Sequence, residues 1–203
     1  RLAFARRRSS PLNLAFDGKS THTNNKNMKL LILDIDETLI YASEEELEKK
    51  SDFVVENYKI YKRPGVNEFL EMVFRIFKIG IWTTANQNYA EKIVEKLHIN
   101  KNNLEFLWTR KNCNNYYDKN TGNSFLIKNL RKVKRLGYNL EEVIVIDDSP
   151  EKHIKNYGNL IVVSSFIGQN NDQELDFLSK YLLWLNLQSN VRTIEKRFWK
   201  SFL

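Results

Sequence analysis

Short apolar runs, each the length of a strand, alternate along this chain with longer segments of helical periodicity. Because the runs are continuously apolar, they predict strands of a parallel sheet with both faces buried under helices. The predicted fold class is therefore α/β, with a Rossmann-like central parallel sheet flanked by helices. The predicted elements are strands at 29–33, 79–83, 143–146 and 160–163, and helices at 66–77, at 87–97, ending near Leu136 before Gly137, starting at Pro150, and two within 172–203.

Two segments interrupt this alternation, and we expect both to be small insertions near the edge of the sheet where ligands bind. Residues 41–62 combine an acidic stretch with a β-rich one, and residues 100–124 are rich in Asn and Tyr. A length of 203 residues suits a single core. We therefore expect one domain at 28–186, followed by a C-terminal helix or tail at 187–203.

The basic charge of the chain is concentrated at its start. Residues 1–27 hold six basic side chains and one acid, which accounts for +5 of the formal net charge of +7 and leaves +2 for the rest. That distribution argues against a nucleic-acid-binding domain. We predict a flexible leader, either an artificial extension ahead of Met28 or a mitochondrial targeting segment, although Pro11 and Asp17 interrupt the amphipathicity of such a signal.

The composition also excludes several classes of protein. The single cysteine, Cys113, cannot form an internal disulfide, and no Cys or His cluster has the spacing of a zinc site. No arginine closes a phosphate-binding loop after Cys113, and no Walker or Gly-rich nucleotide motif occurs. No apolar run approaches the roughly 20 residues that span a bilayer. We expect an intracellular protein, by preference cytoplasmic, with a nuclear or mitochondrial location left open.

Two carboxylates follow the first predicted strand directly. In extended backbone, residues i and i+2 share a face, so Asp34 and Asp36 can address one substrate while Ile35 points into the core. A single acid at this position would normally only start a loop or cap a helix. The pair favours a chemical role.

A second pair of acids, Asp147 and Asp148, follows the strand at 143–146. If this strand lies beside the first, four carboxylates meet at one edge of the sheet, where their repulsion requires a cation. Carboxylate oxygens are ligands that suit Mg²⁺. The sequence therefore predicts a magnesium site.

Four further residues are candidates for binding a substrate phosphate. Thr83 and Thr84 end the strand at 79–83, and hydroxyls can donate to a phosphoryl oxygen, although Thr is common in strands. Lys128 is a lone cation in an apolar stretch, where a charge tends to have a specific partner, unless it is a solvated helical lysine. Arg110 in the second insertion could contact substrate, but exposed arginines usually have no such role.

Together these motifs resemble those of the haloacid dehalogenase superfamily, in the same order and with similar spacing. The segments at 34–39, 62–65 and 147–150 resemble in particular the branch of the small RNA polymerase II C-terminal-domain phosphatases and NLI-interacting-factor-like phosphatases, over residues 29–185. The resemblance implies the superfamily's fold. Only residues 39–82 and 84–127 separate the motifs, which leaves no room for a large cap domain. The other matching segments are 82–85, Tyr89-Ala90 and Lys128.

The resemblance implies a Mg²⁺-dependent phosphomonoester hydrolase. Asp34 would attack phosphorus to give an aspartyl-phosphate, and Asp36 would act as acid and then base. Thr83 would hold a phosphoryl oxygen, and Lys128 would offset negative charge on the nucleophile and the phosphoryl group. The residues implied in metal binding are Asp34, Asp36 (through its backbone carbonyl), Asp148 and Asp147, the last of which could instead orient Lys128.

The substrate stays open at this point. Asp148 stands where many relatives have Asn, so the choice between Asp147 and Asp148 as metal ligand is unresolved. An uncapped cleft suits a phosphorylated protein side chain, which makes a phosphoserine or phosphothreonine protein the implied substrate. Two alternatives are a nucleic-acid 3′-end phosphatase, whose binding would depend strongly on salt, and a catalytically silent binding protein with the same fold, against which the intact site residues argue.

Overall fold

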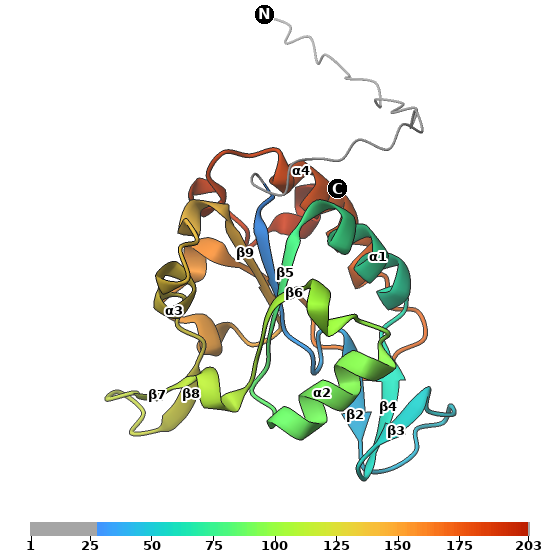
Figure 1. Ribbon diagram of the computed structural model, residues 1–203. Coiled ribbons are helices and arrows are strands. Elements are labelled where there is room, and N and C mark those ends of the chain that lie inside the picture. The colour runs from blue at the N-terminus through green and yellow to red at the C-terminus, as the bar shows by residue number, and fades with distance from the viewer. Residues whose placement is uncertain (1–27, 203) are drawn as a thin grey trace, which may run out of the picture.

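A five-stranded parallel sheet forms the centre of the molecule, with the strand order β10-β9-β1-β5-β6 (Figure 1). The computed structural model describes residues 28–202, so the leader predicted at 1–27 lies outside the described residues. Four of the five strands are those predicted from the apolar runs, and β1 and β9 are neighbours as expected. The strands are β1 Leu30–Leu33, β5 Lys78–Trp82, β6 Leu104–Trp108, β9 Val143–Asp147 and β10 Leu160–Val162.

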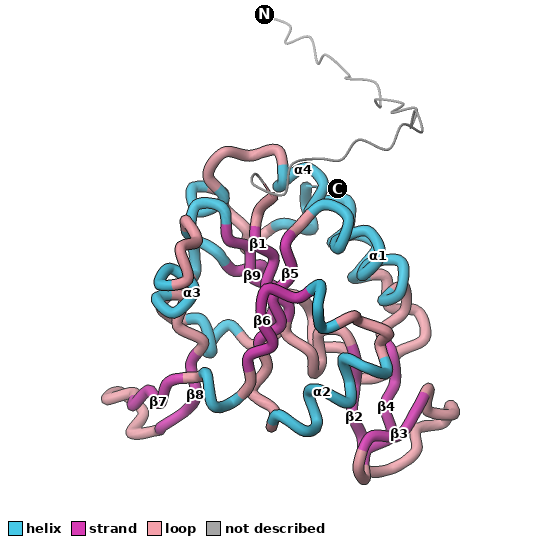
Figure 2. The backbone as a smooth tube through the Cα atoms, viewed as in Figure 1, coloured by secondary structure: helices cyan, strands magenta, loops and turns pink. Residues whose placement is uncertain are grey.

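Helices cover both faces of this sheet (Figure 2). Successive side chains of a strand point to opposite faces, so a continuously apolar strand presents apolar side chains to both. Leu31 and Leu33 of β1 belong to one apolar cluster with residues of α1, α2 and α4. Leu30 and Ile32 belong to a second cluster with Val133 of α3. The predicted α/β class is confirmed. The helices are α1 Val66–Ile76, α2 Gln87–Lys96, α3 Arg131–Arg135 and α4 Glu174–Asn186, and 3-10 turns lie at η2 Lys101–Asn103, η3 Arg110–Asn112, η4 Leu140–Glu142 and η5 Pro150–His153.

The two predicted insertions flank the carboxyl ends of the strands, but the second is shorter than expected. Residues 41–62 contribute to a three-stranded antiparallel sheet of β2 Ile40–Ser43, β4 Tyr58–Lys62 and β3 Phe53–Val55. The prediction for 100–124 is wrong in part, because Leu104–Trp108 forms β6, an edge strand of the central sheet. Its exposed Glu105 breaks the continuous apolar pattern that marks a central strand. Only the hairpin of β7 Asn114–Tyr117 and β8 Ser124–Ile127 projects from the body.

The second helix predicted within 172–203 is not formed. Two 3-10 turns, η7 Val191–Thr193 and η8 Trp199–Phe202, take its place. The buried Lys196 ammonium donates to the carbonyls of Val191 and Ile194, and to the carbonyl of Gly158 at 2.8 Å. In a helix, the carbonyls of Val191 and Ile194 would instead accept from backbone N–H groups. Burial lowers the pKa of Lys196 to about 8.

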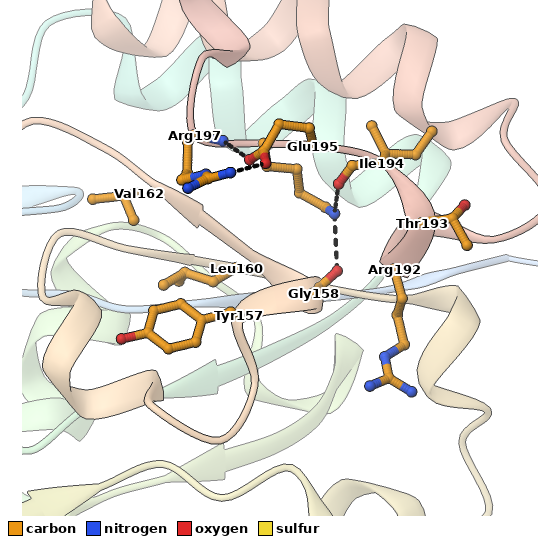
Figure 3. A pocket seen from close by; sticks show the side chains of 10 residues that line it. Tyr157, Gly158, Leu160, Val162, Arg192, Thr193, Ile194, Glu195 and Arg197 are labelled. Carbon is orange, nitrogen blue, oxygen red and sulfur yellow. Dashed lines mark hydrogen bonds and ion pairs between the residues drawn. The ribbon is translucent and has the colours of Figure 1, made fainter.

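A cavity of about 500 Å³ lies between this segment and the turn η6 Tyr157–Asn159. Figure 3 shows its lining, including the ion pair between Arg197 and Glu195. None of the residues predicted for the site lines this cavity. It therefore belongs to the packing of the C-terminal segment.

A buried arginine ties together the loops at the carboxyl edge of the sheet. Arg63, which follows β4, donates to the carbonyls of Thr38 at 3.1 Å and Ser164 at 2.8 Å. It also makes two hydrogen bonds of 2.9 Å to the carboxylate of Asp172, just ahead of α4. Because its side chain is fully buried, Arg63 depends on these acceptors for its charge.

Replacing this acid, as Asp172→Asn, should lower the free energy of unfolding at pH 7 by about 3 kcal/mol, because it leaves a buried guanidinium without its counter-charge. Burial alone would raise the pKa of Asp172, but the hydrogen bonds from Arg63 hold it below its ordinary value of 3.8. The stabilisation is therefore present above pH 3.8 and is lost as the pH falls through the lower pKa of the folded state. Urea unfolding across this range measures the effect.

The matched control is Asp176→Asn, because Asp176 pairs only with Lys180 on the exposed surface of α4. Its loss should cost under about 0.5 kcal/mol. Equal stability of the two variants at pH 7 would contradict the role of Arg63.

Candidate active site

A buried ion pair stands where β1 and β9 end side by side. Asp34 follows β1 and is 2% exposed, and the Lys128 ammonium, at 1% exposure, lies 2.7 Å from its Oδ1. The same ammonium lies 2.5 Å from Oδ2 of Asp147, the last residue of β9. Lys128 itself sits between β8 and α3. One cation therefore fixes the acids of two neighbouring strands.

Carboxylates outnumber the buried cation. Ligand atoms of Asp34, Asp147 and Asp148 all lie within 4.8 Å of one another. Burial and the charge of Asp147 raise the pKa of Asp34 to about 7, against the opposing charge of Lys128. Despite its burial, Lys128 holds the pKa of Asp147 well below its usual range. The excess of negative charge on oxygen ligands fits a hard divalent cation.

The two acids that end β9 have different partners. Both oxygens of Asp147 are occupied, one by the backbone N–H of Ser149 at 2.9 Å and the other by Lys128 and by Nε2 of His153 at 2.8 Å. Burial lowers the pKa of His153, whose ring is fully enclosed.

Asp148 is half-buried, and its carboxylate meets only hydroxyls. Ser149 Oγ donates to one oxygen at 3.1 Å and Ser165 Oγ to the other at 2.7 Å. Asp147 accepts from an ammonium, an imidazole nitrogen and a backbone N–H, whereas the donors to Asp148 are two hydroxyls, which a metal ion can more easily replace or accommodate. Asp148 therefore fits a metal ligand better than Asp147 does.

Asp36 lies on a different side of the site. Its carboxylate accepts from the hydroxyl of Tyr89 at 2.8 Å and from that of Thr83 at 3.4 Å. Burial raises the pKa of Asp36, although both hydrogen bonds oppose the rise. Ile35 between the two acids is fully buried in the core, as predicted. Of the two acids in the Asp-x-Asp pair, Asp34 therefore pairs with Lys128, and Asp36 accepts a hydrogen bond from Tyr89.

A cavity of about 330 Å³ opens onto Asp36. Arg110 lines it, and its Nε donates to the carbonyl of Thr84 at 3.0 Å. The Thr83 hydroxyl also accepts from the N–H of Ala85 at 3.0 Å. This cavity reaches the site on the side of Asp36, and the exposed Arg110 is part of its lining. Its remaining lining residues are Glu37, Ala42, Glu56, Tyr58, Ala85, Asn86 and Tyr89.

Sequence reasoning identified the acids and Lys128 but missed three side chains that hold them. Tyr89 belongs to one of the matching motifs and lies in the first turn of α2, where the side chain of Asn86 caps the helix by accepting from the N–H of Tyr89. His153 and Ser165 carry no local signal, because each reaches its acid only through the folded loops after β9 and β10. The carboxylate of Asp36 lies outside the group of three metal-competent acids.

The fold and this arrangement of acids are those of the haloacid dehalogenase class of phosphatases. Residues 29–192 match the family of NLI interacting factor-like phosphatases. The chain belongs to this family.

Individual relatives agree with this assignment. Phosphatase PSR1 of Saccharomyces cerevisiae is 35% identical over 158 residues, which cover 74% of this chain and 34% of that protein. CTD nuclear envelope phosphatase 1B of Danio rerio is 26% identical over 189 residues, covering 86% of this chain and 74% of that protein. The structure of Fcp1, an RNA polymerase II CTD phosphatase, superposes with a TM-score of 0.60 at 16% identity, covering 79% of this chain and 62% of that one, and so shares the fold.

The match is to a part of several relatives. The chain covers only 28% to 50% of the length of four relatives from two yeasts and Dictyostelium. Across residues 28–202, no helix has the length and apolar character needed to cross a membrane.

Removing the buried cation, as Lys128→Met, should lower the free energy of unfolding by about 3 kcal/mol or more, because the acids around it are left uncompensated. Mg²⁺ should restore part of this loss, since a ligand that binds the folded state stabilises it. Denaturant unfolding in EDTA and in excess Mg²⁺ measures both effects.

Lys132→Met is the matched control. Lys132 is half-buried, whereas Lys128 is fully buried, and among residues 28–202 its ammonium contacts only the carbonyl of Asn112, so its loss should cost about 1 kcal/mol with no dependence on Mg²⁺. A Lys128→Met protein as stable as the wild type in EDTA would rule out the charge imbalance.

Proposed function

We propose that this chain is a Mg²⁺-dependent phosphomonoester hydrolase that works through an aspartyl-phosphate and acts on phosphoserine or phosphothreonine in proteins. The observation that carries the proposal is that the two carboxylate oxygens of Asp34 have different surroundings. Lys128 holds its Oδ1, while Oδ2 makes no hydrogen bond to any of residues 28–202. One oxygen of a fixed, buried carboxylate is thus left available for attack.

In the first step, Oδ2 of Asp34 attacks phosphorus and the bond to the leaving oxygen breaks. The leaving oxygen takes a proton from Asp36, whose raised pKa favours the protonated form. The Lys128 ammonium and the Thr83 hydroxyl stabilise the charge on the phosphoryl oxygens. The product is an aspartyl-phosphate at Asp34.

In the second step, water attacks the phosphorus of this intermediate. Asp36, now ionised, accepts a proton from the water, so free phosphate leaves and both acids return to their starting forms. The hydrogen bonds from Tyr89 and Thr83 hold the Asp36 carboxylate in place for both transfers. Asp36 is therefore the group that couples the two steps.

Asp34 and Asp148 would hold the metal, with the backbone carbonyl of Asp36, and Asp147 would orient Lys128. When bound, Mg²⁺ supplies positive charge that favours the ionised nucleophile and offsets charge on the phosphoryl group. The raised pKa of Asp34 supports this assignment, because a cation beside the carboxylate would favour its ionised form.

Support for a protein substrate comes from the open approach and from relatives. The cavity at Asp36 is shallow and uncapped on the described part of the chain, and Fcp1 is a phosphatase of the RNA polymerase II C-terminal domain. A nucleic-acid 3′-phosphate is the second candidate, which the basic Arg110 at the rim would favour. An intracellular site of action is part of the proposal, in the cytoplasm or at the nucleus, where the CTD nuclear envelope phosphatases belong by name.

Substitutions of the two central acids test the mechanism on p-nitrophenyl phosphate. Asp34→Asn should abolish the Mg²⁺-dependent activity, because no covalent intermediate can form, and Asp36→Asn should reduce kcat by about 10²- to 10⁴-fold. The control Asp176→Asn makes the same chemical change on an exposed helix surface. Equal turnover in all three variants and the wild type would exclude this mechanism.

The hydroxyl of Tyr89 should set the pH dependence of the second step. Tyr89→Phe removes a donor to ionised Asp36, so the pKa of Asp36 should rise further. Because Asp36 must be ionised to act as base, the acidic limb of the kcat profile should move to higher pH by about one unit. A pH-rate profile measures the shift.

Tyr58→Phe is the control for this measurement. Tyr58 lines the same cavity and packs edge-on against Tyr89, but its hydroxyl bonds to no described residue. Its profile should coincide with that of the wild type. A Tyr89→Phe profile that also coincides would show that Tyr89 does not act on Asp36.

A further inference from the structure

Charge is distributed unevenly between two segments that flank the site. Residues 110–135, which include the hairpin and α3, carry eight basic side chains, among them the buried Lys128, and one acid, Asp118. Residues 40–62 carry six acids and four bases. These two segments therefore differ in the sign of their net charge, although the chain outside residues 1–27 has a net charge of only +2.

Four lysines gather around the root of the β7–β8 hairpin, and we name them the cationic face: Lys111, Lys132, Lys152 and Lys155. The contacts of Lys132 with the carbonyl of Asn112 at 2.6 Å, and of Lys155 with the ring of Tyr116 at 5.5 Å, tie α3 and the loop after η5 to the hairpin. None of the four forms an ion pair with an acid among residues 28–202, although such pairs occur elsewhere on the surface.

Lys152 is the residue of the cationic face that connects it to the acids of the site. Its backbone carbonyl accepts the N–H of Lys128 at 2.8 Å, and η5 packs against β8. Burial raises the pKa values of Asp34 and Asp36, and the charge of Lys152 opposes the rise at both. Lys152, which is half-buried and forms no ion pair with residues 28–202, is thus joined through its backbone to the residue that holds Asp34.

The opposite wall of the approach is acidic. Glu37 and Glu56 line the cavity at Asp36. Glu56, in the turn between β3 and β4, is held there by Asn88 at 2.7 Å and by Lys92 at 3.5 Å. A ligand that is anionic along its whole length would be repelled by this wall, whereas a peptide with acids on one side of its phosphoresidue would not.

We propose that the substrate is a phosphoprotein segment with acidic or further phosphorylated residues on one side of the target residue, and that these lie on the cationic face. This inference rests on the proposed phosphatase function and adds its substrate class. The acidic wall opposite favours such a peptide over a nucleic acid, whose phosphates continue on both sides of the reacting group.

Three phosphoserine peptides with one common core test the inference. One carries three glutamates before the phosphoserine, one carries them after it, and one carries glutamines. Exactly one of the two acidic peptides should exceed the neutral peptide in kcat/KM, by about tenfold at low ionic strength. The preference should shrink as salt is raised, because these charges are exposed to solvent.

The double charge reversal Lys111→Glu/Lys155→Glu should remove that preference. Lys96→Glu is the matched control, because Lys96 is exposed at the far end of α2, makes no ion pair with a described residue, and should leave the preference intact. The salt dependence of the wild type tests the same point without any variant, should the double variant not fold.

The outcomes separate the inference from the function on which it rests. If the wild type hydrolyses p-nitrophenyl phosphate but treats all three peptides alike, or prefers both acidic peptides equally, the inference is overturned while the phosphatase function stands. A higher kcat/KM for a 3′-phosphorylated oligonucleotide than for either acidic peptide would overturn it in favour of nucleic acid. No hydrolysis of any substrate would overturn both.

Discussion

The contact of one buried ammonium with two strand-end carboxylates is the constraint on which the rest of the site depends. Lys128 holds Asp34 after β1 and Asp147 at the end of β9. Because a charge at 1% exposure is stable only with its counter-charges in place, hairpin, sheet and α3 must assemble together. The same contact leaves one oxygen of Asp34 unbonded to the described residues. In the proposed mechanism, the ion pair that the fold requires would therefore also position the nucleophile.

Strands whose pattern is local in the sequence could be predicted, whereas a strand that depends on contacts with distant segments could not. Continuous apolar runs specify β1, β5, β9 and β10 locally, and their order at one sheet edge brings Asp34 and Asp147 together. β6 escaped prediction because an edge strand needs no unbroken apolar run, and its Phe106 packs over Gly80 of β5, a position where a side chain would collide with that ring. Such packing between distant segments produces no periodic pattern in the sequence from which the strand could be predicted.

The same distinction applies within the site. The role of Lys128 could be inferred because a lone charge in an apolar stretch is costly without a partner. Ser165 could not, because its hydroxyl reaches Asp148 from the loop after β10. Yet these long-range partners are what separate the two acids that end β9. The carboxylate of Asp147 bonds to Lys128, His153 and a backbone N–H, whereas the donors to Asp148 among the described residues are hydroxyls. The proposed choice of Asp148 over Asp147 as metal ligand rests on this difference in hydrogen-bond partners.

The two insertions give the site its asymmetry. The β2–β4–β3 sheet brings Glu56 and Tyr58 to the approach, and the hairpin brings the root of the cationic face. Neither insertion covers the site, so under the proposed function a substrate would be selected by the charges that flank its phosphoresidue and not by enclosure. Since Coulombic selection of this kind acts on exposed groups, it governs encounter and orientation more than the chemistry itself. In the proposed function, binding would thus depend on charges at the surface, and catalysis on the acids at the strand ends.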